Sequence, residues 1–168
     1  SATPPTARTA TTPALGDAPG NVFGTGKNVP LIALAHNIPY VATASVANLH
    51  DLERKVQKAM SLRGSRYIHI FVPCPLGWGS AAEDTIKVAR LASECGLFPL
   101  WEGELGLVTD SSPIRRKVPV EDYLKTQRRF AHLFKPERDE ERLAALQRMA
   151  DHNIQRFELL REEKEPVI

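Results

Sequence analysis

The residues most able to do chemistry in this chain lie between Tyr67 and Trp78, where a strand-like run ends at Pro73-Cys74-Pro75. The first six of them, Tyr-Ile-His-Ile-Phe-Val, are mostly apolar or β-branched, which predicts a buried, central strand. The two prolines fix φ and remove two N–H donors, so we expect neither a helix nor a strand ladder to continue there. Cys74 is then held on a stiff loop just past the carboxyl end of a strand, where open α/β sheets bind ligands.

Two other residues of reactive type are better explained by packing. His69 lies inside the expected strand, and a lone histidine at such a place is typical of a core position with one satisfied nitrogen. Cys95 falls on the apolar side of a helix expected from Ser80 to Cys95, which Gly96 would end. We therefore interpret Cys95 as a small buried hydrophobic residue.

The elements that position Cys74 follow from the hydrophobic periodicity. Residues 40–46 and 67–72 are predicted strands, and residues 49–60 are a predicted helix with Asn48 as its N-cap. Apolar residues at helical spacing predict the face of this helix that packs on the sheet: Leu49, Leu52, Val56, Ala59 and Met60. A strand–helix–strand unit of this length has parallel strands and a right-handed crossover. We therefore expect the Ser45–Asn48 turn and the Cys74 loop at the same edge of the sheet.

The remaining chain is predicted to add a hairpin and helices. We expect a helix over residues 30–37, and a strand at 97–101 that Pro99 confines to an edge. A turn at 102–106 and a short strand at 107–109 complete an antiparallel hairpin at the rim of the sheet. Two helices are predicted at 121–133 and 137–161, and the second is long enough to pack across another subunit. These elements divide the chain into an irregular arm (1–28), an α/β unit (29–112) and a helical extension (113–168).

Composition narrows the class of protein. The 168 residues are 42% hydrophobic, and 22 basic against 20 acidic side chains give a net charge of +2. This balance argues against broad nucleic-acid binding, and no apolar run approaches the ~20 residues of a membrane span. Two separated cysteines are a poor disulfide framework and favour a reducing, cytoplasmic location. The chain opens at Ser1 in a polar segment without an initiator methionine, so we expect a piece of a longer polypeptide or a processed subunit.

Four segments, in this order along the chain, carry a resemblance to a known family. They are Tyr40-Val-Ala-Thr-Ala-Ser-Val46, Pro73-Cys-Pro-Leu-Gly-Trp78, Gly96-Leu-Phe-Pro-Leu-Trp101 and Arg116-Lys-Val-Pro-Val-Glu-Asp-Tyr-Leu124. With them, the chain resembles the C-terminal part of the β subunit of pyruvate:ferredoxin oxidoreductase and related 2-oxoacid:ferredoxin oxidoreductases. The opening Ser-Ala-Thr-Pro-Pro and the residues Gln127, Arg129 and Phe130 fit the same resemblance, which covers most of residues 1–133.

This resemblance implies an α/β fold of the thiamine-diphosphate-binding type, with a mainly parallel sheet, an edge hairpin and C-terminal helices. It implies three cofactors, a [4Fe-4S] cluster, thiamine diphosphate and Mg²⁺, of which the cluster receives electrons after 2-oxoacid decarboxylation. The fourth cluster cysteine of the family lies in its Pro-Cys-Pro loop, so the resemblance implies a cluster-ligand role for Cys74. The implied partners are the rest of the β subunit, the other subunits, coenzyme A and ferredoxin or a similar electron acceptor.

The chain also departs from the family pattern. The other three cluster cysteines, the Gly-Asp-Gly motif for magnesium and diphosphate, and the Asn-Thr-Gly stretch are absent. By comparison with the family, the chain begins just after those residues, so no catalytic, thiamine-binding or magnesium-binding residue is assigned here.

Three functional interpretations remain open. The first is part of an enzyme that converts a 2-oxoacid and coenzyme A to acyl-CoA and CO₂, with pyruvate as the default substrate and an aryl or branched-chain 2-oxoacid as the alternative. The second is a non-catalytic assembly segment in which Cys74 is an ordinary thiol. The third, a thiamine enzyme without a cluster, is disfavoured by the Pro-Cys-Pro loop.

Overall fold

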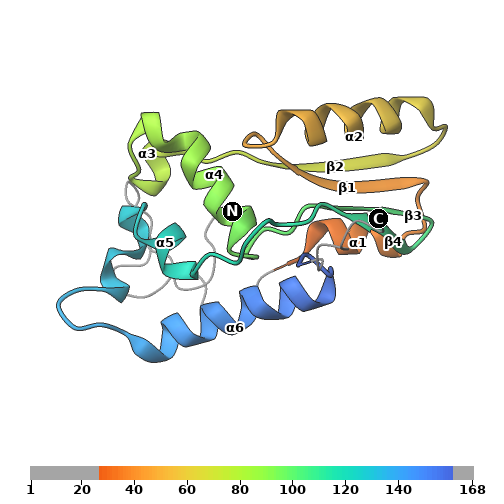
Figure 1. The fold of residues 1–168 in the computed structure, drawn as a ribbon. Helices are drawn as coiled ribbons and strands as arrows, with labels where there is room; N and C mark the ends of the chain where they lie inside the picture. The colour runs from red at the N-terminus through yellow and green to blue at the C-terminus, as the bar shows by residue number, and fades with distance from the viewer. Residues whose placement is uncertain (1–26, 161–168) are drawn as a thin grey trace, which may run out of the picture.

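The computed structural model describes residues 27–160, so the predicted arm lies almost entirely outside the described part. Within it, a four-stranded sheet has helix α2 on one face and helices α1 and α6 on the other (Figure 1). The strands are arranged in the order β2-β1-β3-β4. The α/β class that the sequence predicts is confirmed, although the sheet is mixed, with one parallel and two antiparallel pairings.

The predicted strand–helix–strand unit is confirmed. Strands β1 (Tyr40–Ser45) and β2 (Arg66–Phe71) are parallel, and helix α2 (Leu49–Ser61) joins them. The Val46 N–H donates to the Phe71 carbonyl at 3.3 Å, so the turn after β1 lies beside the segment that leads to Cys74. The expectation that β2 is central is wrong. All of β1 is buried, whereas β2 is a partly exposed edge strand of the described sheet, because the hairpin pairs with the other side of β1.

The hairpin lies at the rim, as predicted, but its strands are shifted along the chain. Strand β3 is Trp101–Glu104 rather than residues 97–101, and β4 is Leu107–Ser111. The ladder begins after Pro99, which has no N–H to donate; its carbonyl instead accepts from the Thr43 hydroxyl at 2.8 Å. The turn is then the pair Leu105-Gly106, both with positive φ (47° and 89°), as a tight two-residue hairpin connection requires.

The predicted buried face of α2 is confirmed for Ala59, which is buried, and in part for Leu52, but it is wrong for the other three residues. Leu49, Val56 and Met60 are 67%, 40% and 74% exposed, whereas Asp51 and Lys55 are buried against the sheet. The reason is the polar surface that the strands offer to this helix. Lys55 donates to the Thr43 carbonyl at 2.9 Å, so the buried charge of α2 has a partner inside. Three of the apolar residues on the helix face outward instead.

The other helices are shorter than the sequence predicts. Asn28 caps α1, and Asp139 caps α6. The predicted helix 80–95 is divided into a 3₁₀ turn and a helix of ten residues, and the predicted helix 121–133 is broken between residues 124 and 128. The bounds are α1 Val29–Ala35, α3 Pro75–Trp78, η1 Ala82–Asp84, α4 Thr85–Glu94, α5 Val120–Leu124, η2 Arg128–Leu133 and α6 Glu140–Arg156.

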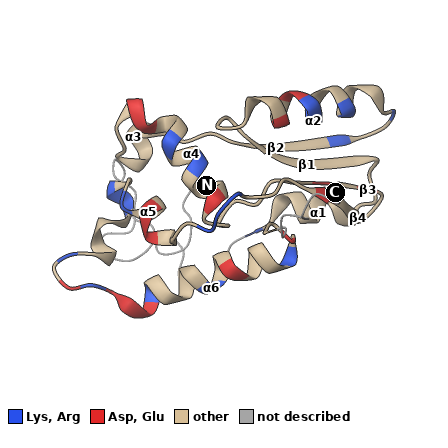
Figure 2. Cartoon of the chain, in the orientation of Figure 1, with Lys and Arg blue, Asp and Glu red and all other residues tan. Residues whose placement is uncertain are grey.

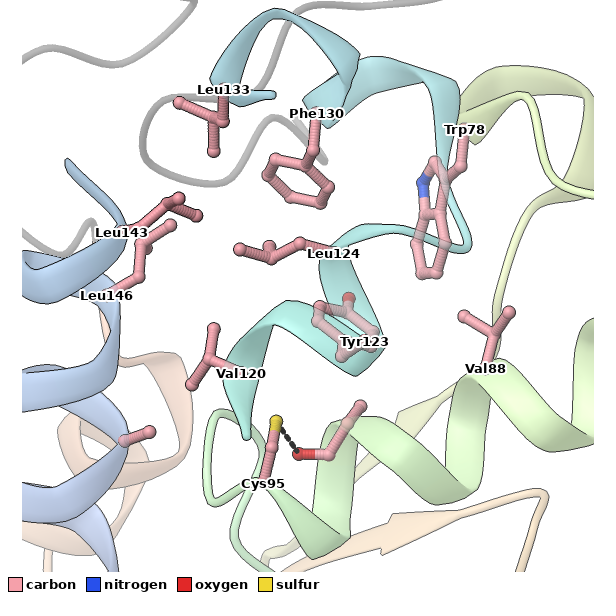
Figure 3. Packing of buried hydrophobic residues seen from close by; sticks show 12 residues of the cluster. Trp78, Val88, Cys95, Val120, Tyr123, Leu124, Phe130, Leu133, Leu143 and Leu146 are labelled. Atoms are coloured by element: carbon pink, nitrogen blue, oxygen red, sulfur yellow. Dashed lines mark hydrogen bonds between the residues drawn. The ribbon is translucent and has the colours of Figure 1, made fainter. Parts of the chain in front are cut away.

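The core joins the sheet to the C-terminal helices. Figure 3 shows one hydrophobic cluster in which side chains of α4, α5, η2 and α6 converge with Trp78 and Cys95. A second cluster lies under the sheet, where the Trp101 and Phe157 rings stack with their centroids 5.6 Å apart. Helix α6 therefore buries its apolar face against its own chain, and its packing across another subunit stays a prediction. The division of the chain into domains stays a prediction.

Candidate functional site

Cys74 lies where the sequence predicts it, immediately beyond β2, and its thiol is exposed and free. The expectation that no helix follows the prolines is wrong, because Cys74 is the N-cap of the one-turn helix α3. Pro75 occupies the first helical position, where its fixed φ suits the helix and its missing N–H is not needed. The turn closes through Trp78 N–H to the Cys74 carbonyl at 2.9 Å and Gly79 N–H to the Pro75 carbonyl at 2.8 Å.

The surroundings of the thiol are open on one side and apolar. A Cβ added to Gly77 would lie 3.2 Å from the Cys74 sulfur, so glycine at this position keeps space beside the thiol. Val72 and Leu76, on either side of Cys74 in the chain, are 56% and 80% exposed. The thiol therefore stands on an exposed, apolar stretch of the surface.

A buried cation lies against the same turn. The Arg129 guanidinium is 3.9 Å from the centre of the Trp78 ring and 4.9 Å from that of Phe130, and the residue is 4% exposed. Burial lowers the pKa of Arg129, while the charge and the hydroxyl of Tyr123 act in the opposite direction. Arg129 thus packs on the ring of Trp78, the last residue of the turn that Cys74 begins.

Backbone and side-chain hydrogen bonds fix Arg129 in this position. Its Nε donates to the Gln127 Oε1 at 2.9 Å, and its Nη2 donates to the Tyr123 hydroxyl at 3.2 Å. The Arg128 N–H donates to the Gly79 carbonyl at 3.3 Å, which ties the start of η2 to the end of the Cys74 turn. In the sequence, Arg129 has no role beyond the resemblance, because its position beside Trp78 is a long-range contact that no local pattern shows.

An iron–sulfur cluster fits this site in part. Thiolates hold such clusters, and Cys74 offers an exposed sulfur on a fixed turn with space beside it. Within residues 27–160, no group of three or more His, Cys, Asp or Glu side chains could hold a metal ion. A four-cysteine cluster would therefore take its other ligands from outside this part of the chain.

The two alternative reactive residues have structural roles, as predicted. His69 is partly buried, its Nδ1 lies 2.7 Å from the Tyr67 hydroxyl, and burial lowers its pKa. Cys95 is fully buried, and its thiol donates weakly to the Ala92 carbonyl at 3.5 Å (Figure 3). Burial raises the pKa of Cys95 to about 12, so it remains an unreactive thiol at neutral pH.

A second group of charged residues lies between α2 and the sheet and was missed by the sequence analysis. Glu102 accepts from the Tyr40 hydroxyl at 2.6 Å and from Arg54 and Lys58 at 3.2 and 3.1 Å. The basic residues of α2 are visible in Figure 2 along its length. Every charge in this group has a partner of opposite sign, so the arrangement is suited to holding the helix on the sheet.

Comparisons with curated proteins place the chain among subunits of 2-oxoacid oxidoreductases. It is 45% identical over 163 residues to pyruvate synthase subunit PorB of Methanosarcina barkeri, covering 95% of this chain and 53% of that relative. It is 42% identical over 134 residues to the PorB subunit of Pyrococcus furiosus, covering 68% and 40%. It is 43% identical over 111 residues to ketoisovalerate oxidoreductase subunit VorB of Pyrococcus abyssi, covering 65% and 36%.

The chain therefore belongs to the 2-oxoacid:ferredoxin oxidoreductase β-subunit family, within the branch that contains pyruvate synthase and ketoisovalerate oxidoreductase subunits. It spans about half the length, or less, of the relatives it matches. No protein-family model matches the chain. Among residues 27–160, no helix combines the length and apolar character needed to cross a membrane.

Proposed function

We propose that this chain is part of a β subunit in which Cys74 is one ligand of a [4Fe-4S] cluster. The observation that carries the proposal is the exposed thiol on a hydrogen-bonded turn at the carboxyl end of a parallel strand. Iron–sulfur clusters are held by cysteine thiolates and transfer single electrons when bound. The other three ligands would come from polypeptide outside the described residues.

The activity that fits this family is oxidative decarboxylation of a 2-oxoacid with coenzyme A, giving acyl-CoA and CO₂, with ferredoxin or a similar protein as electron acceptor. Thiamine diphosphate and Mg²⁺ would be bound mainly outside this chain. Within the chain, Cys74 would hold the cluster, and the turn that contains it would fix the direction of its sulfur.

Pyruvate is the first-choice substrate, because a relative that matches 95% of this chain is named as a pyruvate synthase subunit. A branched-chain 2-oxoacid is the alternative, because other relatives of similar identity are named as ketoisovalerate oxidoreductase subunits. An aryl 2-oxoacid is the third choice and is supported only by the resemblance. Rates with these three acids would rank them.

The exposed apolar surface beside Cys74 supports an assembly role. Ile70 on the edge strand β2 and Val72 just beyond it are exposed, and so are Leu49, Val56 and Met60 on α2. Large exposed apolar patches mark interaction surfaces. We propose the rest of the β subunit as its occupant, since the matched relatives are about twice the length of the match. The assembled enzyme would work in the cytoplasm, consistent with two free cysteines.

The test is the iron and acid-labile sulfide content of the purified native assembly, comparing wild type with Cys74→Ser and Cys95→Ala. We expect Cys74→Ser to lose about one cubane, four iron atoms, per copy of this chain, and Cys95→Ala to lose none. Unchanged iron in Cys74→Ser, in an assembly with all its subunits, would refute the ligand role. That result would favour the alternative of a non-catalytic assembly segment.

A further inference from the structure

Arg129 is the charged side chain that the fold brings against the Cys74 turn. It comes from η2, more than fifty residues further along the chain, and its guanidinium packs 3.9 Å from the centre of the Trp78 ring. Trp78 is itself the last residue of the one-turn helix that Cys74 begins. The cation and the thiol are therefore held at opposite ends of the same four-residue helix.

This arrangement is rigid at several points. Trp78 is 8% exposed, so the packed side chains around it hold its ring in place, and its backbone N–H donates to the Cys74 carbonyl, which closes the turn. On the other side, Gln127 and Tyr123 accept hydrogen bonds from two different nitrogens of the guanidinium. An arginine bound through its planar fork and stacked on an aromatic face keeps one orientation, which a lysine ammonium would not.

A fixed arginine also keeps its charge. The guanidinium is protonated in proteins under all ordinary conditions, so Arg129 places a permanent positive charge in a region with little solvent. Charges in such a place are screened much less than charges at the surface. The reduction potential of an iron–sulfur cluster depends on net charge and on solvent exposure around it.

The geometry points to Arg129 as a positioning residue that raises the reduction potential of the group bound at Cys74. The inference rests on the proposed cluster-ligand role of Cys74 and goes further by assigning the residue that sets the cluster's electron affinity. A cluster held at Cys74 would gain one negative charge on reduction, and the buried charge of Arg129 would favour that reduced state. Trp78 acts as the spacer that holds the guanidinium at a constant distance from the turn.

The chain offers a matched control in the adjacent residue. Arg128 is exposed, precedes Arg129, and contributes its backbone N–H rather than its side chain to the contact with Gly79. Arg128→Met and Arg129→Met make the same change in net charge within the same 3₁₀ helix. A difference between the two variants therefore reports the buried position of the charge and not the charge of the whole protein.

The experiment is a redox titration of the purified holoenzyme, in which the electron paramagnetic resonance signal of the cluster lost in Cys74→Ser is followed. We expect Arg129→Met to lower the equilibrium constant for one-electron reduction roughly tenfold, which is about 59 mV for such a couple. Arg129→Gln should act in the same direction, Arg129→Lys should retain most of the wild-type potential, and Arg128→Met should leave it unchanged.

Three results would overturn the inference. The first is an unchanged reduction potential in both Arg129→Met and Arg129→Gln. The second is a shift of the reduction potential in Arg128→Met that equals the shift in Arg129→Met. Failure of both neutral variants to assemble would also do so, because Arg129 would then be a residue needed for folding. The proposed function fails separately: if Cys74→Ser retains its full iron content, Cys74 is not a ligand, whatever the Arg129 variants show.

Discussion

Asp51→Ala removes the carboxylate that Lys55 binds in the interior between α2 and the sheet. The Lys55 ammonium lies 2.7 Å from the Asp51 Oδ2 and 2.9 Å from the Thr43 carbonyl, and Lys55 is fully buried. Asp51 also accepts from Arg54 at 3.2 Å and from the Ser112 hydroxyl at 2.8 Å. The substitution therefore leaves a buried ammonium without its counter-charge.

The expected loss follows from this burial. Removing one partner of a buried ion pair costs about 3–5 kcal/mol, because the remaining charge is neither solvated nor neutralised. For a protein of this size, 1 kcal/mol moves the unfolding midpoint by about 2–4 °C, so Asp51→Ala should lower it by roughly 6–20 °C. Replacing both charges removes the penalty, so Asp51→Ala/Lys55→Met should be more stable than Asp51→Ala alone.

The measurement is urea-induced and thermal unfolding of the full-length subunit. The single variants Asp51→Ala and Lys55→Met and the double variant are compared with the wild type under the same conditions. Lys125→Met is the matched control, because Glu121 on α5 and Lys125 at its C-cap have the same i, i+4 spacing but their side chains are 29% and 54% exposed. It should cost no more than about 0.5 kcal/mol. The reasoning would be refuted if the double variant were as unstable as Asp51→Ala. It would also be refuted if Lys125→Met lost as much unfolding free energy as Asp51→Ala.

Two further predictions concern the thiols and a helix end. In the cluster-free folded subunit at pH 8, iodoacetamide should alkylate the exposed Cys74. The buried Cys95, whose pKa is raised to about 12, should react only after the subunit is unfolded. Alkylation of both thiols at equal rates, followed by mass spectrometry, would contradict this prediction. Gly96→Ala should lower the free energy of unfolding in urea by about 1–3 kcal/mol. The reason is that φ at this position is +83° and that a Cβ would lie 2.6 Å from the Ile154 side chain and 2.8 Å from the Ala150 carbonyl oxygen. An unchanged urea midpoint would contradict this packing.

Local sequence patterns predicted where the helices and strands of this fold lie better than they predicted which faces of those elements are buried. The parallel pair of strands, the Asn48 cap and the stop at Gly96 follow from short-range rules and are confirmed. The buried face of α2 does not follow from them, because periodicity cannot show that the facing strands offer the Thr43 carbonyl and the Glu102 carboxylate to a charged stripe. An Asp at i with a Lys at i+4, followed by a small residue at i+8, was the signal available in the sequence.

Of the two residues at the candidate site, Cys74 could be predicted from the sequence and Arg129 could not. Cys74 between two prolines was visible in the sequence, since proline acts on the backbone of its immediate neighbours. Arg129 reaches the site across more than fifty residues, and a basic residue near the end of an apolar helix gives no sign of burial. Only the folded structure shows that it packs on the Trp78 ring.

The break in the predicted helix 121–133 and the position of Arg129 have a single cause. Gln127 adopts an extended backbone, and its side chain donates to the Tyr123 carbonyl at 2.9 Å, which replaces a helical bond. The next N–H, that of Arg128, goes to Gly79 in the Cys74 turn instead of to its own helix. An uninterrupted helix would satisfy those groups internally and would leave Arg129 without a contact to Trp78. The departure from local helical preference thus falls at the point that joins the C-terminal helices to the reactive thiol, where strain between local and global structure is expected of a functional site.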